Sequence, residues 1–154
     1  MESGKLNNMV LEIYKGGIPV IEVMERWYND FKLEGYGAMI PFIGIVRPDN
    51  GIDGLSFDLY LPLLTEWFKK WQNLPDAKIT MAHSFGDVKV GETSFLCAVF
   101  TKHRKEGFKY LEEFVEDFKA NAPIWKYDLK DGKRIFASDR AKPLPQSGIL
   151  KKDN

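Results

Sequence analysis

Apolar residues recur every three or four positions in three stretches of the chain, and this spacing predicts helices that lay one face on a core. The predicted helices cover residues 19–32, 62–72 and 102–120. Prolines support their limits, because proline is tolerated in a first turn but cannot continue a helix interior. These prolines are Pro19, Pro62 and Pro123. The expected buried stripe of the third helix consists of Phe108, Leu111, Val115, Phe118 and Ala122.

Runs rich in β-branched and aromatic residues predict the strands. They cover residues 9–14, 35–46, 55–60, 78–85, 93–100 and 135–137. Pro41 favours an edge position or a bulge for the second strand, because proline cannot donate to a sheet ladder. Gly86 and Asp87 predict a turn after the fourth strand, and the glycine-containing connection to the fifth suggests a hairpin. Residues 128–134 are predicted to form a polar turn.

The order of these elements, β-α-β-β-α-β-β-α-β, predicts an α+β fold with helices layered on a mixed sheet. With 154 residues, of which 44% are apolar, the chain has the size of one domain with a real core. That domain is assigned to residues 1–137. Residues 138–154, rich in Pro, Lys and Ser, lack core-forming periodicity and are expected to form a tail that is mobile or docked on a partner.

Composition and charge narrow the classes of function. The 22 basic and 22 acidic residues cancel, so no general affinity for nucleic acid or membranes is expected. No apolar run approaches the roughly 18 residues of a membrane span. The first ten residues lack a signal-peptide core. A cytoplasmic protein is therefore expected.

Residues that usually hold metals or attack substrates are scarce. The only cysteine, Cys97, lies in a predicted buried strand and is expected to be a small hydrophobe rather than a nucleophile. His83 has no second His or Cys at ligand spacing, so a hydrogen-bonded histidine on the sheet is expected rather than a metal ligand. Nucleotide-loop, zinc-protease and serine-hydrolase motifs do not occur. No metal and no cofactor are therefore expected.

Positive charge gathers where the third helix begins, although a helix N-terminus favours acidic residues. Lys102, His103, Arg104 and Lys105 form this first turn. The free N–H groups of a helix N-terminus, together with Arg or His, can bind an anion, and phosphate suits such a site best. Arg47, which follows the second predicted strand, is a further candidate, although such an arginine is more often a solvated surface charge.

Two lysines flank the predicted end of the third helix. Lys119 falls at the margin of the apolar stripe and is expected to be half buried. Among other cations, it can act as an acid, a base or an amine nucleophile, or it can simply keep its ammonium in water. If the chain turns back after Pro123, Lys126 lies near Lys119. This cluster predicts cation-assisted chemistry on a phosphorylated substrate, with the remaining reagent supplied from elsewhere.

Six motifs between about residue 35 and residue 126 carry a family resemblance. They are Phe42-Ile43-Gly44-Ile45-Val46-Arg47, Leu55-Ser56-Phe57-Asp58-Leu59-Tyr60, His83-Ser84-Phe85-Gly86, Val90-Gly91-Glu92, Thr101-Lys102-His103-Arg104 and Ala122-Pro123-Ile124-Trp125-Lys126. Together they resemble the large, catalytic subunit of molybdopterin synthase. The chain departs from that family's usual pattern at Ser84, Asp58 and Ile45, where Arg, Glu, and Lys or Thr are common.

The resemblance implies an α/β hammerhead fold with an additional antiparallel β subdomain. It also implies a homodimer that binds two copies of a small ubiquitin-like sulfur-carrier subunit, giving a 2:2 heterotetramer. In that family the carrier's C-terminal Gly-Gly thiocarboxylate enters the active-site pocket. Two sulfurs then pass to cyclic pyranopterin monophosphate and form the dithiolene of molybdopterin.

The resemblance also implies a role for individual residues. Lys119 and Lys126 match the catalytic lysines, while Arg47, His103 and Arg104 match the pocket that holds the substrate phosphate. The match further implies that four residues line or flank this pocket: Ile45, Val46, Tyr127 and Asp128. The alternative function is a non-catalytic dimeric module that binds a phosphorylated ligand or a ubiquitin-like Gly-Gly tail.

Overall fold

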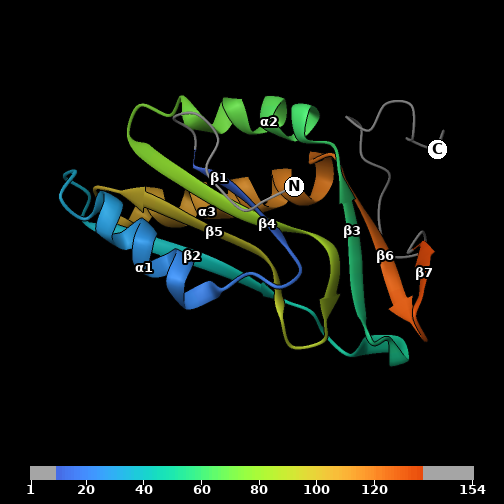
Figure 1. Ribbon diagram of the computed structural model, residues 1–154. Helices are drawn as coiled ribbons and strands as arrows, with labels where there is room; N and C mark the ends of the chain where they lie inside the picture. The colour runs from blue at the N-terminus through green and yellow to red at the C-terminus, as the bar shows by residue number, and fades with distance from the viewer. Residues whose placement is uncertain (1–9, 137–154) are drawn as a thin grey trace.

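The chain forms seven strands and three α-helices within residues 10–136, the part that this computed structural model describes (Figure 1). They are β1 (Leu11–Lys15), α1 (Val20–Phe31), β2 (Ala38–Ile45), β3 (Gly54–Leu59), α2 (Leu61–Lys69), β4 (Ala77–Lys89), β5 (Thr93–Thr101), α3 (Arg104–Asn121), β6 (Ile124–Lys130) and β7 (Lys133–Phe136). Short 3₁₀ turns cover Asp49–Gly51 and Lys70–Gln72. The predicted order and the α+β class are confirmed, with one strand more than expected. The predicted tail over residues 138–154 lies outside the described residues.

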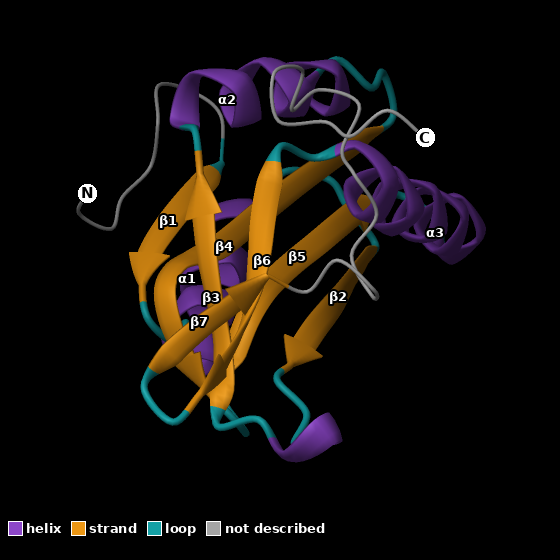
Figure 2. Cartoon of the chain, turned by 90° about the vertical axis from the view of Figure 1, so that its right-hand side faces the viewer, coloured by secondary structure: helices purple, strands orange, loops and turns teal. Residues whose placement is uncertain are grey.

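The long strand β4 belongs to both halves of the sheet. Its first residues pair antiparallel with β5, and the stretch Gly86 to Lys89 pairs antiparallel with β3. The strand order is β2-β5-β4-β3-β6-β7, and β1 adds to β4 in parallel. Figure 2 looks onto the side where β3, β6 and β7 form the additional antiparallel part. This arrangement confirms the expected helix-covered sheet with an antiparallel addition.

The turn predicted at Gly86 and Asp87 is wrong, because β4 continues through both residues to Lys89. Gly86 has a φ of +76°, which a glycine adopts readily, so β4 passes from one pairing partner to the other without ending. The chain instead reverses around Gly91, at a φ of +88°, and the predicted hairpin between β4 and β5 is confirmed.

The edge position that Pro41 favours is confirmed, whereas the irregularity of the strand does not lie at Pro41, which pairs regularly with Ala98. Strand β2 lies at the edge of the sheet and pairs only with β5 among the described strands. Its register shifts between Gly44 and Ile45, where the ladder is irregular. The strand therefore bends just before Arg47.

The connection predicted after Pro123 is wrong, because β6 starts there, whereas the polar turn predicted for residues 128–134 is confirmed at Asp131 and Gly132 and is shorter than expected. Trp125 and Lys126 lie within β6, and the positive φ angles of Asp131 and Gly132, 52° and 74°, form the tight turn into β7. Because β6 is half-buried and β7 is exposed, their side chains include many polar residues, and this hides the strand pattern.

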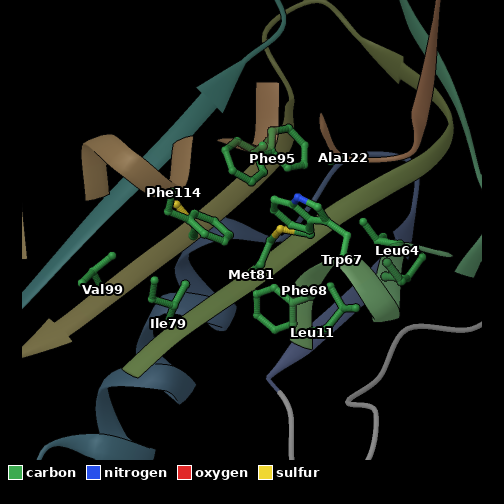
Figure 3. Close-up of a cluster of buried hydrophobic side chains, with 13 residues drawn as sticks. Leu11, Leu64, Trp67, Phe68, Ile79, Met81, Phe95, Val99, Phe114 and Ala122 are labelled. Carbon is green, nitrogen blue, oxygen red and sulfur yellow. The ribbon is translucent and has the colours of Figure 1, made fainter. Parts of the chain in front are cut away.

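Helices cover both faces of the sheet part formed by β1, β2, β4 and β5. Alternate residues of β5 face opposite cores: Leu96, Ala98 and Phe100 pack with α1, and Phe95, Cys97 and Val99 pack with α2 and α3. Figure 3 shows the second core, in which Trp67 and Phe68 of α2 meet Phe114 of α3. Burial on both faces explains the almost continuous apolar run of β5.

The buried face of α3 is rotated about the helix axis relative to the predicted apolar stripe. Phe108 is 58% exposed, whereas Phe114 is fully buried. The buried face is centred on Gly107, Phe114 and Phe118. A Cβ atom at Gly107 would lie 2.7 Å from Cδ1 of Ile40, so the missing side chain allows the helix to lie close to β2.

Candidate functional site

A cavity of about 640 Å³ opens where the end of β2, the bend of β4, the last turns of α3 and the start of β6 meet. Apolar side chains, including Phe42, Phe57 and Phe95, form much of its wall. Its charged groups are three cations and two carboxylates: Arg47, Lys119, Lys126, Asp49 and Glu116. A cavity that combines apolar walls with a few convergent charged groups is a usual form of a ligand site.

Five of the predicted site residues reach this cavity. They are Ile45, Val46, Arg47, Lys119 and Lys126. Ile45 is 61% exposed at the end of β2, whereas the side chain of Val46 is buried. Arg47 follows on the loop, and its guanidinium lies 3.1 Å from the carboxylate of Asp49.

The end of α3 explains how two lysines share one cavity. Ala122 leaves the helix with an extended ψ of 136°, as expected for a residue that precedes proline. Strand β6 then starts at Ile124 and runs antiparallel to β3, which places Lys126 opposite Phe57. The prediction that the chain turns back after Pro123 and brings Lys126 to the surroundings of Lys119 is therefore confirmed.

The prediction that Lys119 is half buried is wrong, because its side chain is exposed in this chain. The reason is the rotation of α3. Lys119 follows the buried Phe118 and lies about 100° around the helix from it, beyond the face that contacts the sheet.

His103 and Arg104 lie at the opposite end of α3 from Lys119. Fifteen residues separate Arg104 from Lys119, which corresponds to about 22 Å at the helical rise of about 1.5 Å per residue. His103 precedes the helix in an extended conformation, and both side chains are exposed. A single chain therefore does not bring these two residues to the cavity that contains the lysines.

Tyr127 and Asp128 follow Lys126 on β6 without lining the cavity. Successive side chains on a strand point to opposite faces, so Tyr127 points away from the face of Lys126. Its ring packs on Phe136 and lies 4.0 Å below the guanidinium carbon of Arg134.

Sequence reasoning missed that His83 lines the cavity. The expected hydrogen bond on the sheet is confirmed, because Nδ1 lies 2.8 Å from the carbonyl oxygen of Ser84. Burial lowers the pKa of His83 to about 4; the bond to Ser84 opposes this shift, and the charge of Lys119 adds to it. His83 is therefore neutral near pH 7 and close enough to Lys119 to sense its charge.

Of the three residues that depart from the family pattern, two form a hydrogen bond or an ion pair and the third is exposed. Ser84 is buried, and its hydroxyl donates to the carbonyl oxygen of Gly16 at 2.5 Å. The carboxylate of Asp58 lies 2.9 Å from the guanidinium of Arg134. Ile45 borders the cavity, where it adds an apolar edge beside Arg47.

The described residues include neither a metal-binding cluster nor an accessible thiol. Between residues 10 and 136, no group of three or more His, Cys, Asp or Glu side chains could hold a metal ion. Cys97 is fully buried, and burial raises the pKa of its thiol, so the expected role as a small hydrophobe is confirmed. None of the helices in this range is long and apolar enough to cross a membrane.

Comparison with known proteins identifies the family of the chain. The family model described as MoaE protein matches residues 20–121. The molybdopterin synthase catalytic subunits of two Helicobacter pylori strains, 26695 and J99, are 44% and 38% identical to the chain, each over 92% of the chain and 99% of the relative.

Solved structures show the same fold. In a complex of subunits 1 and 2 of the molybdopterin-converting factor from Helicobacter pylori 26695, one chain superposes with a TM-score of 0.85 at 45% identity, covering 92% of this chain and 99% of that chain. The molybdopterin synthase of Staphylococcus aureus, 23% identical, superposes with a TM-score of 0.66 over 86% of this chain and 99% of its own and supports the fold alone. The chain therefore belongs to the MoaE family, the catalytic subunits of molybdopterin synthase.

Proposed function

We propose that this chain is the catalytic subunit of a molybdopterin synthase, a sulfurtransferase of molybdenum cofactor biosynthesis. It transfers two sulfurs from the C-terminal thiocarboxylate of a small ubiquitin-like carrier subunit to cyclic pyranopterin monophosphate and forms the molybdopterin dithiolene. The observation that carries this function is the convergence of Lys119, Lys126 and Arg47 on one cavity, in a chain 44% identical to such a subunit over 92% of its length.

The charges of the cavity suit two anionic reactants. A thiocarboxylate and a phosphate both bear negative charge, and ammonium and guanidinium groups bind such groups through charge-assisted hydrogen bonds. In this proposal Lys119 holds the carrier's thiocarboxylate and assists attack or proton transfer. Lys126 orients the pterin or stabilises its phosphate as the ring opens. Sulfur that arrives on a carrier also explains how the reaction proceeds with Cys97 buried in the core.

His103 and Arg104 enter this function through a second copy of the chain. In one chain they lie about 22 Å along α3 from Lys119, at about 1.5 Å per residue. In a homodimer, α3 of one protomer can bring them to the cavity of its partner, where they add to the phosphate site. With one carrier on each protomer, the assembly is a 2:2 heterotetramer.

The alternative is a non-catalytic dimeric module that binds a phosphorylated ligand or a Gly-Gly tail. Two lysines on one cavity favour the enzyme, because binding a phosphate does not require both at this spacing. The cytoplasmic location expected from the sequence stays a prediction.

The direct test combines the purified protein with a thiocarboxylated carrier and cyclic pyranopterin monophosphate, then measures the fluorescence of the oxidised dithiolene product. We expect product with the natural chain and at least a hundredfold less with Lys119→Ala, the effect expected from removing a charge that acts at the reacting atoms. Lys109→Ala, on the exposed face of α3, is the matched control. Pterin binding without any product from the natural chain would favour the binding module.

A further inference from the structure

His83 lines the cavity and has no part in the function described above. Its ring is 2% exposed on β4 and is held by three aromatic rings. Phe57 contacts it edge-on at 5.0 Å between centroids, and Phe118 and Phe95 lie at 5.5 Å and 6.0 Å. The ring is therefore fixed in orientation before any ligand enters.

The backbone determines which ring nitrogen carries the proton. A carbonyl oxygen only accepts hydrogen bonds, so the contact of 2.8 Å between Nδ1 and the Ser84 carbonyl assigns the proton to Nδ1. In a neutral ring the other nitrogen, Nε2, then presents a lone pair. Nε2 has no hydrogen-bond partner among residues 10–136.

The charged groups of the same cavity determine what this lone pair meets. The neighbouring ammonium is that of Lys119, whose charge contributes to the low pKa of His83. Lys126 and Arg47 add positive charge from β6 and from the loop after β2, and the carboxylates are those of Glu116 and Asp49. Asp49 is engaged with Arg47 at 3.1 Å. A neutral acceptor among cations attracts an ammonium hydrogen.

We propose that His83 is a positioning residue for Lys119, whose ammonium donates a hydrogen bond to Nε2 when the carrier's tail fills the cavity. This inference rests on the proposed function. The exposed Lys119 side chain has four rotatable bonds, and an acceptor held in a fixed orientation restricts where its ammonium lies. A neutral imidazole orients the ammonium and leaves its positive charge intact, whereas a carboxylate in the same place would cancel that charge.

Two amide substitutions separate the two ring nitrogens. In His83→Gln the side-chain amide reaches the position of Nε2 and keeps an acceptor toward the cavity. In His83→Asn the amide reaches only the position of Nδ1, keeps the bond to Ser84 and loses the acceptor. We expect dithiolene formation by His83→Asn with kcat at least tenfold lower and KM for the pterin changed less than twofold, and His83→Gln within threefold of the natural kcat. Equal kcat values for the two variants would overturn the proposal.

A second measurement does not depend on activity or on the stability of variants at position 83. The chain has only two histidines, His83 and His103, so ring ¹⁵N signals of a histidine-labelled protein can be assigned with His103→Gln. With the carrier bound in its unreactive carboxylate form, we expect the Nε2 signal of an unprotonated nitrogen that shifts in Lys119→Met and not in Lys126→Met. A protonated Nε2, or no shift in Lys119→Met, would overturn the proposal. A natural enzyme that forms no dithiolene would instead count against the proposed function.

Discussion

The buried His83 makes the stability of the protein sensitive to acid. Its pKa falls from 6.5 to about 4 in the folded chain, chiefly because of burial. A lowered pKa means that the unfolded chain binds the proton more readily, so the stabilisation is complete above pH 6.5 and is lost as the pH falls toward 4. At about 1.4 kcal/mol per pH unit, the loss approaches about 3 kcal/mol.

Urea unfolding at pH 7 and pH 4.5 measures this effect. The difference in unfolding free energy between the two pH values should be smaller in His83→Gln, which cannot titrate. His103→Gln is the matched control, because it also removes one histidine but from an exposed site. An unchanged pH dependence in His83→Gln would contradict the expectation.

Glu12 is a second buried titratable residue whose pKa is shifted by its neighbours. Burial alone would raise its pKa, but hydrogen bonds from Arg26, Tyr14 and Trp27 outweigh burial and lower it. Arg26 contacts both carboxylate oxygens, at 2.5 and 2.9 Å. The stabilisation is therefore present at neutral pH and is lost as the pH falls through the lowered pKa.

Replacing Arg26 by Met leaves this carboxylate buried without its charge partner. We expect the free energy of unfolding to fall by about 3 kcal/mol at pH 7, measured by urea denaturation. The double variant Glu12→Leu/Arg26→Met removes both charges and should recover part of this loss. A loss below about 1 kcal/mol in the single variant would show that water or other donors satisfy Glu12 equally well.

At the scale of the element, the close contact of α3 with β2 can be tested at Gly107. Alanine in place of glycine usually favours a helix, by about 1 kcal/mol. Here the added Cβ would lie 2.7 Å from Cδ1 of Ile40 and 2.8 Å from Oγ1 of Thr101. We expect Gly107→Ala to destabilise the protein by about 1 to 2 kcal/mol because the helix must move outward.

The double variant Ile40→Val/Gly107→Ala removes the Cδ1 atom that the new Cβ meets. Thermal or urea unfolding should show it to be more stable than the sum of the two single changes predicts, since the two residues touch. Strictly additive losses would mean that Thr101, or the helix backbone, limits the approach.

The periodicity of the sequence determines most of the elements but not their rotation or extent. The three helices and their proline limits follow from local spacing, which acts over a few residues. The bend at Gly86 could not be told from a turn, because strand β4 continues only where β3, some 30 residues earlier, offers a partner. The face of α3 depends likewise on Gly107, a residue that no apolar pattern would place at the centre of a contact.

At the scale of the whole molecule, the predicted site residues lie at both ends of α3. We therefore expect two inactive variants, each changed at a different end, to restore activity in a mixed dimer. If the phosphate site is shared between protomers, a mixed dimer of Lys119→Ala and Arg104→Ala contains one cavity with both natural residues. Mixing the two inactive variants under subunit exchange should then restore up to about a quarter of the natural activity, because about half of the dimers are mixed and each has one intact cavity.

The matched control mixes Lys119→Ala with Lys126→Ala, both of which damage the cavity of their own chain. No activity should return in that mixture. If the first mixture also remains inactive after confirmed exchange, then His103 and Arg104 act within their own chain or outside the site.

From the sequence, the candidate site can be predicted only where charged residues lie near the end of a helix or strand, or where proline predicts that the chain reverses. Lys119, Lys126 and Arg47 stand out as cations near a helix end or strand end, and the structure brings them to one cavity. His83 gives no such signal, because a histidine in a strand of apolar residues has the same local pattern whether it faces a core or a cavity. The motif residues alone also do not show that Arg104 and Lys119 lie at opposite ends of α3.

Strand β4 has a consequence for how this protein can be divided. Its first part completes the backbone ladder of β1 and β5, and its last residues complete that of β3. If either part of the sheet were removed, the segment of β4 that paired with it would be left with a row of unpaired N–H and C=O groups. Such a row costs free energy and promotes aggregation. The antiparallel addition is therefore not a module that could be grafted or deleted, because β4 forms part of both ladders.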